Sequence, residues 1–126
     1  MSYVVSKDEF AALVELALEE LPEEFAEFLE EVPIEIRDRP TPRQLKRARV
    51  PRNGLLLGLY EGRPRTRRSV QDSGVMPDVI FIFQEHIEAT ARTREDLVRQ
   101  VRITVLHEIG HHFGMSEEDL ERLGYR

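Results

Sequence analysis

The stretch that decides the fold is residues 97–114, LVRQVRITVLHEIGHHFG. Its apolar side chains project in nearly every direction around a helix, and a helix that is apolar all round is usually buried. Thr93 with Asp96 resembles a capping box that opens this helix. Gly114 is typical of the residue that ends a helix in a left-handed cap. We therefore predict a buried helix that runs to about Phe113.

Two histidines in this helix have the spacing of metal ligands. His107 and His111 are four residues apart, so on a helix they lie on one face and their imidazoles can converge on one ion. Glu108 lies about a hundred degrees round from His107, which lets it border the metal without ligating it. Zinc lowers the pKa of a bound water from about 15.7 to near 7, and a neighbouring carboxylate can serve as general base. The segment thus predicts a catalytic zinc site with Glu108 as base.

A third protein ligand is needed, because a catalytic zinc takes three and leaves the fourth position for water. Gly114 lets the chain turn sharply after the helix, and the first acidic side chain beyond it is Glu117. We predict Glu117 as this ligand, with Glu118 and Asp119 as alternatives. The helix macrodipole alone would favour all three at a helix N-terminus, so a capping role stays open for each of them.

The remaining histidines are not expected to bind the metal. His112 points about a hundred degrees away from His111 on the helix, and we interpret it as a packing or supporting residue. His86 is interpreted as a solvated loop histidine.

The rest of the chain alternates between helical and strand-like patterns. In order we predict a helix opened by Ser6 and Glu9, a helix from Pro22, a strand over 32–37, a loop over 38–53, a strand over 54–60, a loop over 63–77, a strand over 79–83, a short helix over 86–91, and a last helix over 116–124. The run 79–83, VIFIF, is apolar on both faces, so we expect it to be covered on both. Pro33 favours the start of a strand or a sheet edge.

These elements predict a single α+β domain over residues 1–126, with a small mixed sheet of about three to four strands packed against helices that include the buried motif helix. The absence of cysteine excludes disulfides, thiolate zinc sites and cysteine nucleophiles. No window approaches the roughly 20 apolar residues of a membrane helix. We expect no membrane partner and a cytoplasmic location.

The net charge of -6 hides an acidic first part, residues 1–38, and a basic part, residues 39–68. Basic clusters can bind nucleic acid. Nothing aromatic interleaves with these arginines, however, as stacking on single-stranded nucleic acid would require. We favour arginines that pair with acidic residues or are solvated. Nucleic-acid binding through residues 39–68 is the weaker alternative.

The run from His107 to Gly114 resembles the mini-zincins, small bacterial zincin-like metallopeptidases. The resemblance also includes LPEEF at 21–25, GLYEG at 58–62 and Pro77-Asp78. It implies a minimal zincin scaffold in which a small sheet packs on helices with the motif helix beneath it. It further implies zinc bound by His107, His111 and an acidic residue after Gly114, with Glu108 as base.

Two classes of function remain after these arguments. The first is a zinc-dependent metallopeptidase that holds a peptide or protein substrate by β-augmentation on an edge strand. The second is a zinc-binding scaffold or regulator without turnover. The presence of Glu108 favours the enzyme, since a structural site needs no base. Only residues 115–126 follow Gly114, so we expect no lower subdomain to wall the cleft, and this favours the scaffold.

Overall fold

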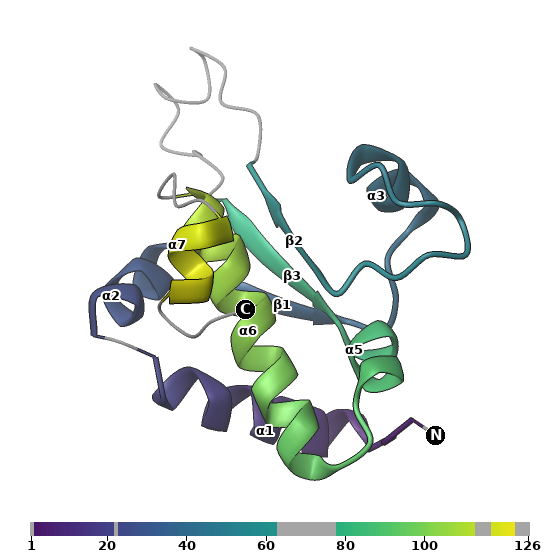
Figure 1. Cartoon of the computed structure of the whole chain (residues 1–126), viewed down its shortest axis with the longest axis horizontal. Helices are drawn as coiled ribbons and strands as arrows, with labels where there is room; N and C mark the ends of the chain where they lie inside the picture. The colour runs from purple at the N-terminus through teal and green to yellow at the C-terminus, as the bar shows by residue number, and fades with distance from the viewer. Residues whose placement is uncertain (1, 22, 63–77, 113–116, 123–126) are drawn as a thin grey trace.

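The computed structural model describes residues 2–21, 23–62, 78–112 and 117–122. Within these ranges, the side chains at positions 24, 28, 31, 111, 112, 117, 119 and 120 lie outside the description. The described residues form a small α+β fold, in which helices pack on a three-stranded sheet (Figure 1). The predicted fold class is thereby confirmed.

The sheet is mixed and has β3 at its centre. Its strands are β1 (Ile34–Arg37), β2 (Gly58–Glu61) and β3 (Val79–Phe83), in the order β1-β3-β2. β1 runs parallel to β3, with Ile34 opposite Ile80, whereas β2 runs antiparallel to it, with Gly58 opposite Ile82. All five residues of β3 are buried, which confirms that this strand is covered on both faces.

The described helices differ in length. They are α1 (Lys7–Glu19), α2 (Glu23–Glu31), α3 (Pro42–Arg47), α5 (Gln84–Thr90), α6 (Arg94–His112) and α7 (Glu117–Arg122). The 19-residue α6 crosses the sheet with α1 beside it (Figure 1). None of the described helices combines the length and apolar content needed to cross a bilayer.

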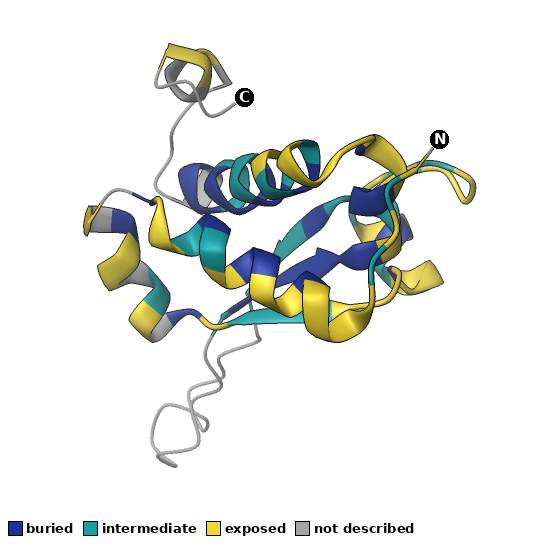
Figure 2. Cartoon of the chain, turned by 90° about the horizontal axis from the view of Figure 1, so that it is seen from below, coloured by how far each residue is buried: buried dark blue, intermediate teal, exposed yellow. Residues whose placement is uncertain are grey.

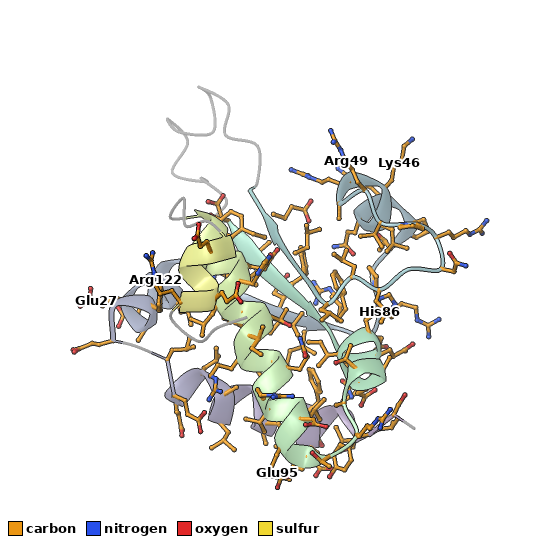
Figure 3. All side chains as sticks on the ribbon, viewed as in Figure 1. Glu27, Lys46, Arg49, His86, Glu95 and Arg122 are labelled. Carbon is orange, nitrogen blue, oxygen red and sulfur yellow. The ribbon has the colours of Figure 1, made fainter. Side chains whose placement is uncertain are left out.

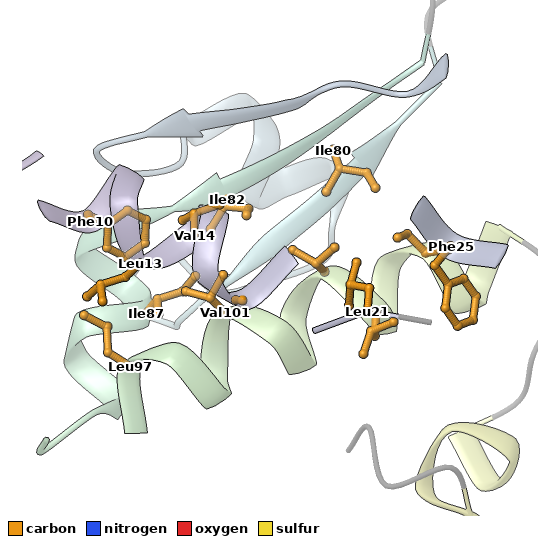
Figure 4. Packing of buried hydrophobic residues seen from close by; sticks show 14 of the residues in the cluster. Phe10, Leu13, Val14, Leu21, Phe25, Ile80, Ile82, Ile87, Leu97 and Val101 are labelled. Carbon is orange, nitrogen blue, oxygen red and sulfur yellow. The ribbon is translucent and has the colours of Figure 1, made fainter. Parts of the chain in front are cut away.

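The main core lies between one face of the sheet and the helices α1 and α6. Ile80 and Ile82 of β3 point into it and belong to one cluster with Phe10 of α1 and Val101 of α6 (Figure 4). Buried residues concentrate on the sheet and on the sides of α1 and α6 that face it (Figure 2). A smaller cluster on the opposite face holds the alternate β3 residues Val79, Phe81 and Phe83 with Leu56 and Leu59.

The starts of two helices match their sequence signals. Ser6 caps α1, because its side chain accepts the N–H of Glu9 at 3.1 Å. Thr93 does the same for α6 by accepting the N–H of Asp96 at 3.1 Å. These bonds satisfy main-chain donors that a helix N-terminus leaves without an intrahelical partner. The predicted end of α6 at Phe113 and Gly114 lies outside the described residues.

The prediction of a loop over residues 38–53 missed the short helix α3. Thr41 and Gln44 form a full capping box, with both reciprocal bonds present, and Pro42 occupies the first turn. Proline is tolerated there because its missing N–H would have had no partner in the first turn. A proline in this segment can therefore indicate the start of a helix as well as a loop.

The predicted strand over 54–60 begins too early, since β2 starts only at Gly58. The N–H of Gly54 donates to the carbonyl of Pro51 in a turn, and the N–H of Leu56 donates to a side chain, His86. These N–H groups are already bonded and cannot pair with a neighbouring strand, so the first residues of the apolar run 54–60 lie before β2. The predicted loop over 63–77 lies outside the described residues.

Candidate metal centre

The motif helix α6 lies unusually close to β2, and Gly58 makes this possible. A Cβ atom at Gly58 would lie 2.6 Å from Cγ2 of Thr104 and 3.1 Å from the carbonyl oxygen of Phe81. It would also contact Cγ of Glu108 at 3.7 Å. Any side chain at this position would push helix and strand apart. The glycine therefore sets the distance between the edge strand of the described sheet and the helix that carries the motif.

The carboxylate of Glu108 is anchored to the outer edge of β2. Its Oε1 accepts the main-chain N–H of Tyr60 at 2.7 Å. The carbonyl of Leu57 accepts the N–H of Phe83. Along an antiparallel pair, the main-chain N–H and C=O groups of every second residue point to the same partner strand. Residues 57, 59 and 61 therefore direct their main-chain N–H and C=O groups toward β3. Gly58 and Tyr60 then direct theirs to the outer edge, on the side of Glu108.

Tyr60 is fixed through its side chain as well as its main chain. Its hydroxyl donates to the carboxylate of Asp78, next to the start of β3. The strand residue that binds the predicted base is therefore held at two points. This restricts the orientation of the Glu108 carboxylate, which a general base requires.

A pocket of about 340 Å³ opens between α6 and the chain that leads into β2. It is lined by Leu55, Leu56, Leu57, Gly58, Gln100, Ile103, Thr104, His107 and Glu108. His107 and Glu108, predicted as ligand and base from adjacent sequence positions, thus border one pocket. A molecule in it would meet an imidazole and a carboxylate together.

The interpretation of His86 as a solvated loop histidine is wrong. His86 belongs to α5, on the same side of the molecule as α3 (Figure 3). It is half-buried, and its Nδ1 accepts the N–H of Leu56 at 2.9 Å. A nitrogen that accepts in this way carries no proton. His86 is therefore a structural residue that fixes one wall of the pocket, and its partner is too far away in sequence for any local pattern to reveal it.

The structure describes the remaining predicted ligands only in part. His111 lies in α6, four positions after His107, and Glu117 is the first residue of α7. Glu118 is exposed, while the side chains of His111, Glu117 and Asp119 lie outside the description. Among the described side chains, no three that could hold a metal ion gather together. The convergence of His107, His111 and Glu117 therefore stays a prediction.

Of the three predicted zinc ligands, His107 is the one whose side chain the structure describes. α6 is helical from Arg94 through His112, so positions 107 and 111 keep the spacing that places them on one face. His107 borders an open pocket, and imidazole is a preferred zinc donor. Glu108 is bound to the main chain of β2 beside it, which suits a carboxylate that borders the ion.

Two arginines of the basic segment form ion pairs with acidic side chains. Arg39 lies 3.2 Å from a carboxylate oxygen of Glu85, and Arg47 lies 3.2 Å from one of Glu61. Lys46 and Arg49 of the same region are exposed at the periphery, on and just after α3 (Figure 3). Exposed pairs of this kind contribute at most about 1 kcal/mol. They neutralise part of the basic segment.

Comparison with known proteins bears on the family and the fold. A family model described as zincin-like metallopeptidase matches residues 29–125, which include all three strands, α6 and α7. No curated protein matches significantly. Among solved structures, a conserved hypothetical protein from Thermo thermophilus is similar, with a TM-score of 0.58 and 22% identity over 86% of this chain and 94% of that chain. At this identity the likeness shows a shared fold.

Proposed function

Because this chain belongs to the zincin-like metallopeptidase family, we propose that it is a zinc-dependent peptidase with Glu108 as its general base. The observation that carries the proposal is the shared pocket of His107 and Glu108 at the start of the edge strand β2, with the base anchored on that strand at 2.7 Å. A peptide laid along β2 would therefore meet the base and the first ligand together.

We assign the metal to His107, His111 and Glu117. The two histidines are separated by one helical turn in α6, and Glu117 opens the next helix. Zinc held there by two imidazoles and one carboxylate would supply Lewis acidity and would lower the pKa of a water molecule to near 7. Neutral imidazoles are required, so we expect metal binding to weaken as acid protonates them.

Glu108 moves the proton in this proposal. Its carboxylate takes a proton from the attacking water and later gives it to the amine that leaves. The hydrogen bond from the N–H of Tyr60 holds one carboxylate oxygen in place, so the group does not have to find its orientation during the reaction.

The peptide would lie along the outer edge of β2. Gly58 turns its main-chain groups to this edge, as inferred above from the pairing with β3, and an extended peptide can add to such an edge as a further strand. Main-chain pairing gives affinity without sequence preference, so specificity must come from side-chain pockets.

A zinc-binding scaffold without turnover is the second candidate. The bond between Glu108 and Tyr60 favours it, because that contact ties α6 to β2 and gives the carboxylate a structural use. A purely structural role would leave zinc-dependent hydrolysis absent while the metal is bound.

The substitution Glu108→Gln separates the two candidates. We expect it to keep stoichiometric zinc and to reduce peptide hydrolysis by about 10²–10⁴-fold, the usual contribution of a general base. Digestion of a peptide library followed by mass spectrometry, with zinc content measured on the same samples, reads both effects. The matched control is Glu85→Gln, an exposed carboxylate on α5, which should leave both unchanged.

Three outcomes of this experiment decide between the alternatives. Hydrolysis that survives in the Glu108→Gln protein would remove Glu108 from the mechanism. Loss of zinc in that protein would make Glu108 a ligand. A zinc-loaded wild-type protein that cleaves no peptide would favour the scaffold.

The third ligand is tested by comparing alanine variants at three neighbouring positions. Glu117→Ala should weaken zinc affinity markedly, since it removes a ligand. Glu118→Ala and Asp119→Ala should act mainly on the start of α7, at about 1 kcal/mol of stability. If either of these two carries the large loss of zinc affinity instead, the ligand is misassigned by one or two positions.

A further inference from the structure

The pocket beside the metal centre extends well past the residues that the proposed chemistry uses. We propose that Leu55, Leu57 and Ile103 form an apolar subsite that takes the side chain of a residue flanking the scissile bond, of about the size of leucine or phenylalanine. This inference rests on the proposed function and names the class of substrate: peptides with a large apolar residue beside the cleaved bond.

The lining of the pocket favours an apolar occupant. Leucines at 55–57 and Ile103 supply much of it, and the residues with ionisable side chains are His107 and Glu108 at the metal centre. Thr104 adds little polarity, because its hydroxyl donates to the carbonyl of Gln100 at 2.7 Å within the helix. Leu55, Leu56 and Leu57 form one wall of the pocket, the leucine wall. A charged side chain would lose hydration here without gaining a partner of opposite charge from this wall, which is costly.

Leu55 is the residue whose exposure points to a missing partner. It is 53% exposed, and among the described residues it is one of two large apolar side chains with such exposure, the other being Val4. Leu55 stands at the pocket, whereas Val4 lies in the N-terminal segment. An apolar side chain in the pocket would cover Leu55 and remove its surface from water, which is favourable.

The leucine wall is held in place before any substrate arrives. The N–H of Leu56 donates to Nδ1 of His86 at 2.9 Å, and the carbonyl of Leu57 accepts the N–H of Phe83 at 3.0 Å. A wall fixed at two points loses little conformational freedom on binding, so its contacts translate into affinity. A volume of about 340 Å³ falls within the range of about 300–1,000 Å³ usual for small-ligand sites.

The occupant is the substrate's own side chain because the pocket and the metal centre are continuous. His107 and Glu108 line the same pocket as Leu55 and Ile103. A side chain seated against the leucine wall therefore brings its own main chain next to the base.

Small amides test the subsite without requiring turnover. Acetyl-leucine amide and acetyl-asparagine amide, whose polar side chain carries no carboxylate that could bind the zinc, are titrated into the zinc-loaded protein and followed by ¹H–¹⁵N NMR. We expect shifts confined to residues 55–58 and 100–108, with the asparagine amide at least about tenfold weaker, the scale of discrimination in apolar pockets. The substitution Leu55→Lys should weaken the leucine amide about tenfold, whereas Val4→Lys, the matched control, should not.

Cleavage of the peptide library supplies the second readout. The wild-type protein should enrich leucine, isoleucine, methionine or phenylalanine on one side of the cleaved bond, and Leu55→Lys should lower kcat/KM for those peptides about tenfold. A second variant, Leu55→Ser, guards against misfolding of the lysine protein. Cleavage without apolar enrichment, or enrichment that survives both Leu55 variants, overturns the subsite while the peptidase stands. Leucine-amide binding at the wall without any cleavage overturns the peptidase, and with it the role of the subsite beside a scissile bond. Equal binding of the two amides overturns the apolar preference of the pocket itself.

Discussion

Adding one methyl group at Gly58 should separate the motif helix from the edge strand. In Gly58→Ala the new Cβ would lie 2.6 Å from Cγ2 of Thr104, far inside van der Waals contact, and 3.1 Å from the carbonyl oxygen of Phe81. Thr104 is 5% exposed and β-branched, so its rotamer is restricted in a helix. The clash therefore cannot be relieved by rotation of a flexible side chain.

The expected cost follows from overpacking in a tight interface. Such insertions typically destabilise by about 1–3 kcal/mol, and we expect Gly58→Ala to lose that amount of unfolding free energy. The displacement also acts on the site, since Glu108 reaches the N–H of Tyr60 across the same interface at 2.7 Å. Zinc-dependent hydrolysis should fall along with stability.

A double-mutant cycle isolates the contact. Thr104→Ser deletes the clashing Cγ2 and keeps the hydroxyl that donates to the carbonyl of Gln100. The double variant should lose less unfolding free energy than the two single variants lose together, by about 1 kcal/mol or more, because the effects of residues in contact do not add. The recovery should be incomplete, since the carbonyl of Phe81 stays close.

Urea denaturation followed by circular dichroism measures each variant. Gly62→Ala is the control, because among the described residues the one atom that a Cβ there would meet is Asp78 Oδ1, at an ordinary 3.5 Å. If Gly58→Ala and Gly62→Ala unfold at the same midpoint, or if Thr104→Ser brings no recovery, then the close approach of α6 to β2 is not what requires glycine at this position.

Other contacts allow shorter tests. Glu88→Ala should lower the unfolding free energy by about 1–3 kcal/mol, because the buried carboxylate accepts the N–H of Val5 at 2.9 Å. An equal loss of unfolding free energy in Glu88→Gln, which keeps an acceptor, would contradict this reason. Ser6→Ala should cost about 1 kcal/mol through loss of the α1 cap, and an unchanged urea midpoint would refute it. His86→Ala should speed amide hydrogen exchange at Leu56, whereas an unchanged rate would show that the wall is held by other contacts.

The elements that sequence predicted well are those whose signals are local. The VIFIF run of β3 and the apolar periodicity of α6 each lie within one segment, and both elements are observed. The caps at Ser6 and Thr93 involve a donor three residues away. Helix α3 also carried a local signal in Thr41 and Gln44, which the neighbouring prolines outweighed.

The features that sequence could not predict join distant segments. The late start of β2 depends on His86, whose Nδ1 binds Leu56 from 30 positions away. The hydrogen bond from the N–H of Tyr60 to Glu108 spans 48 positions. That β2 is an edge strand follows from the strand order, in which β1 pairs with the opposite side of β3. The motif identified two residues of the pocket, His107 and Glu108, while its leucine wall became evident only in three dimensions.

The most direct test of the proposed metal centre is the zinc content of the purified protein, measured on wild-type, His107→Ala, His111→Ala and His86→Ala. His86 is the matched control, because it is a histidine of the same fold that binds a main-chain N–H. We predict one zinc per chain for the wild-type and His86→Ala proteins and a loss of stoichiometric zinc in the other two. Stoichiometric zinc in His107→Ala or His111→Ala would contradict the assignment of the metal to α6, and with it the proposed peptidase.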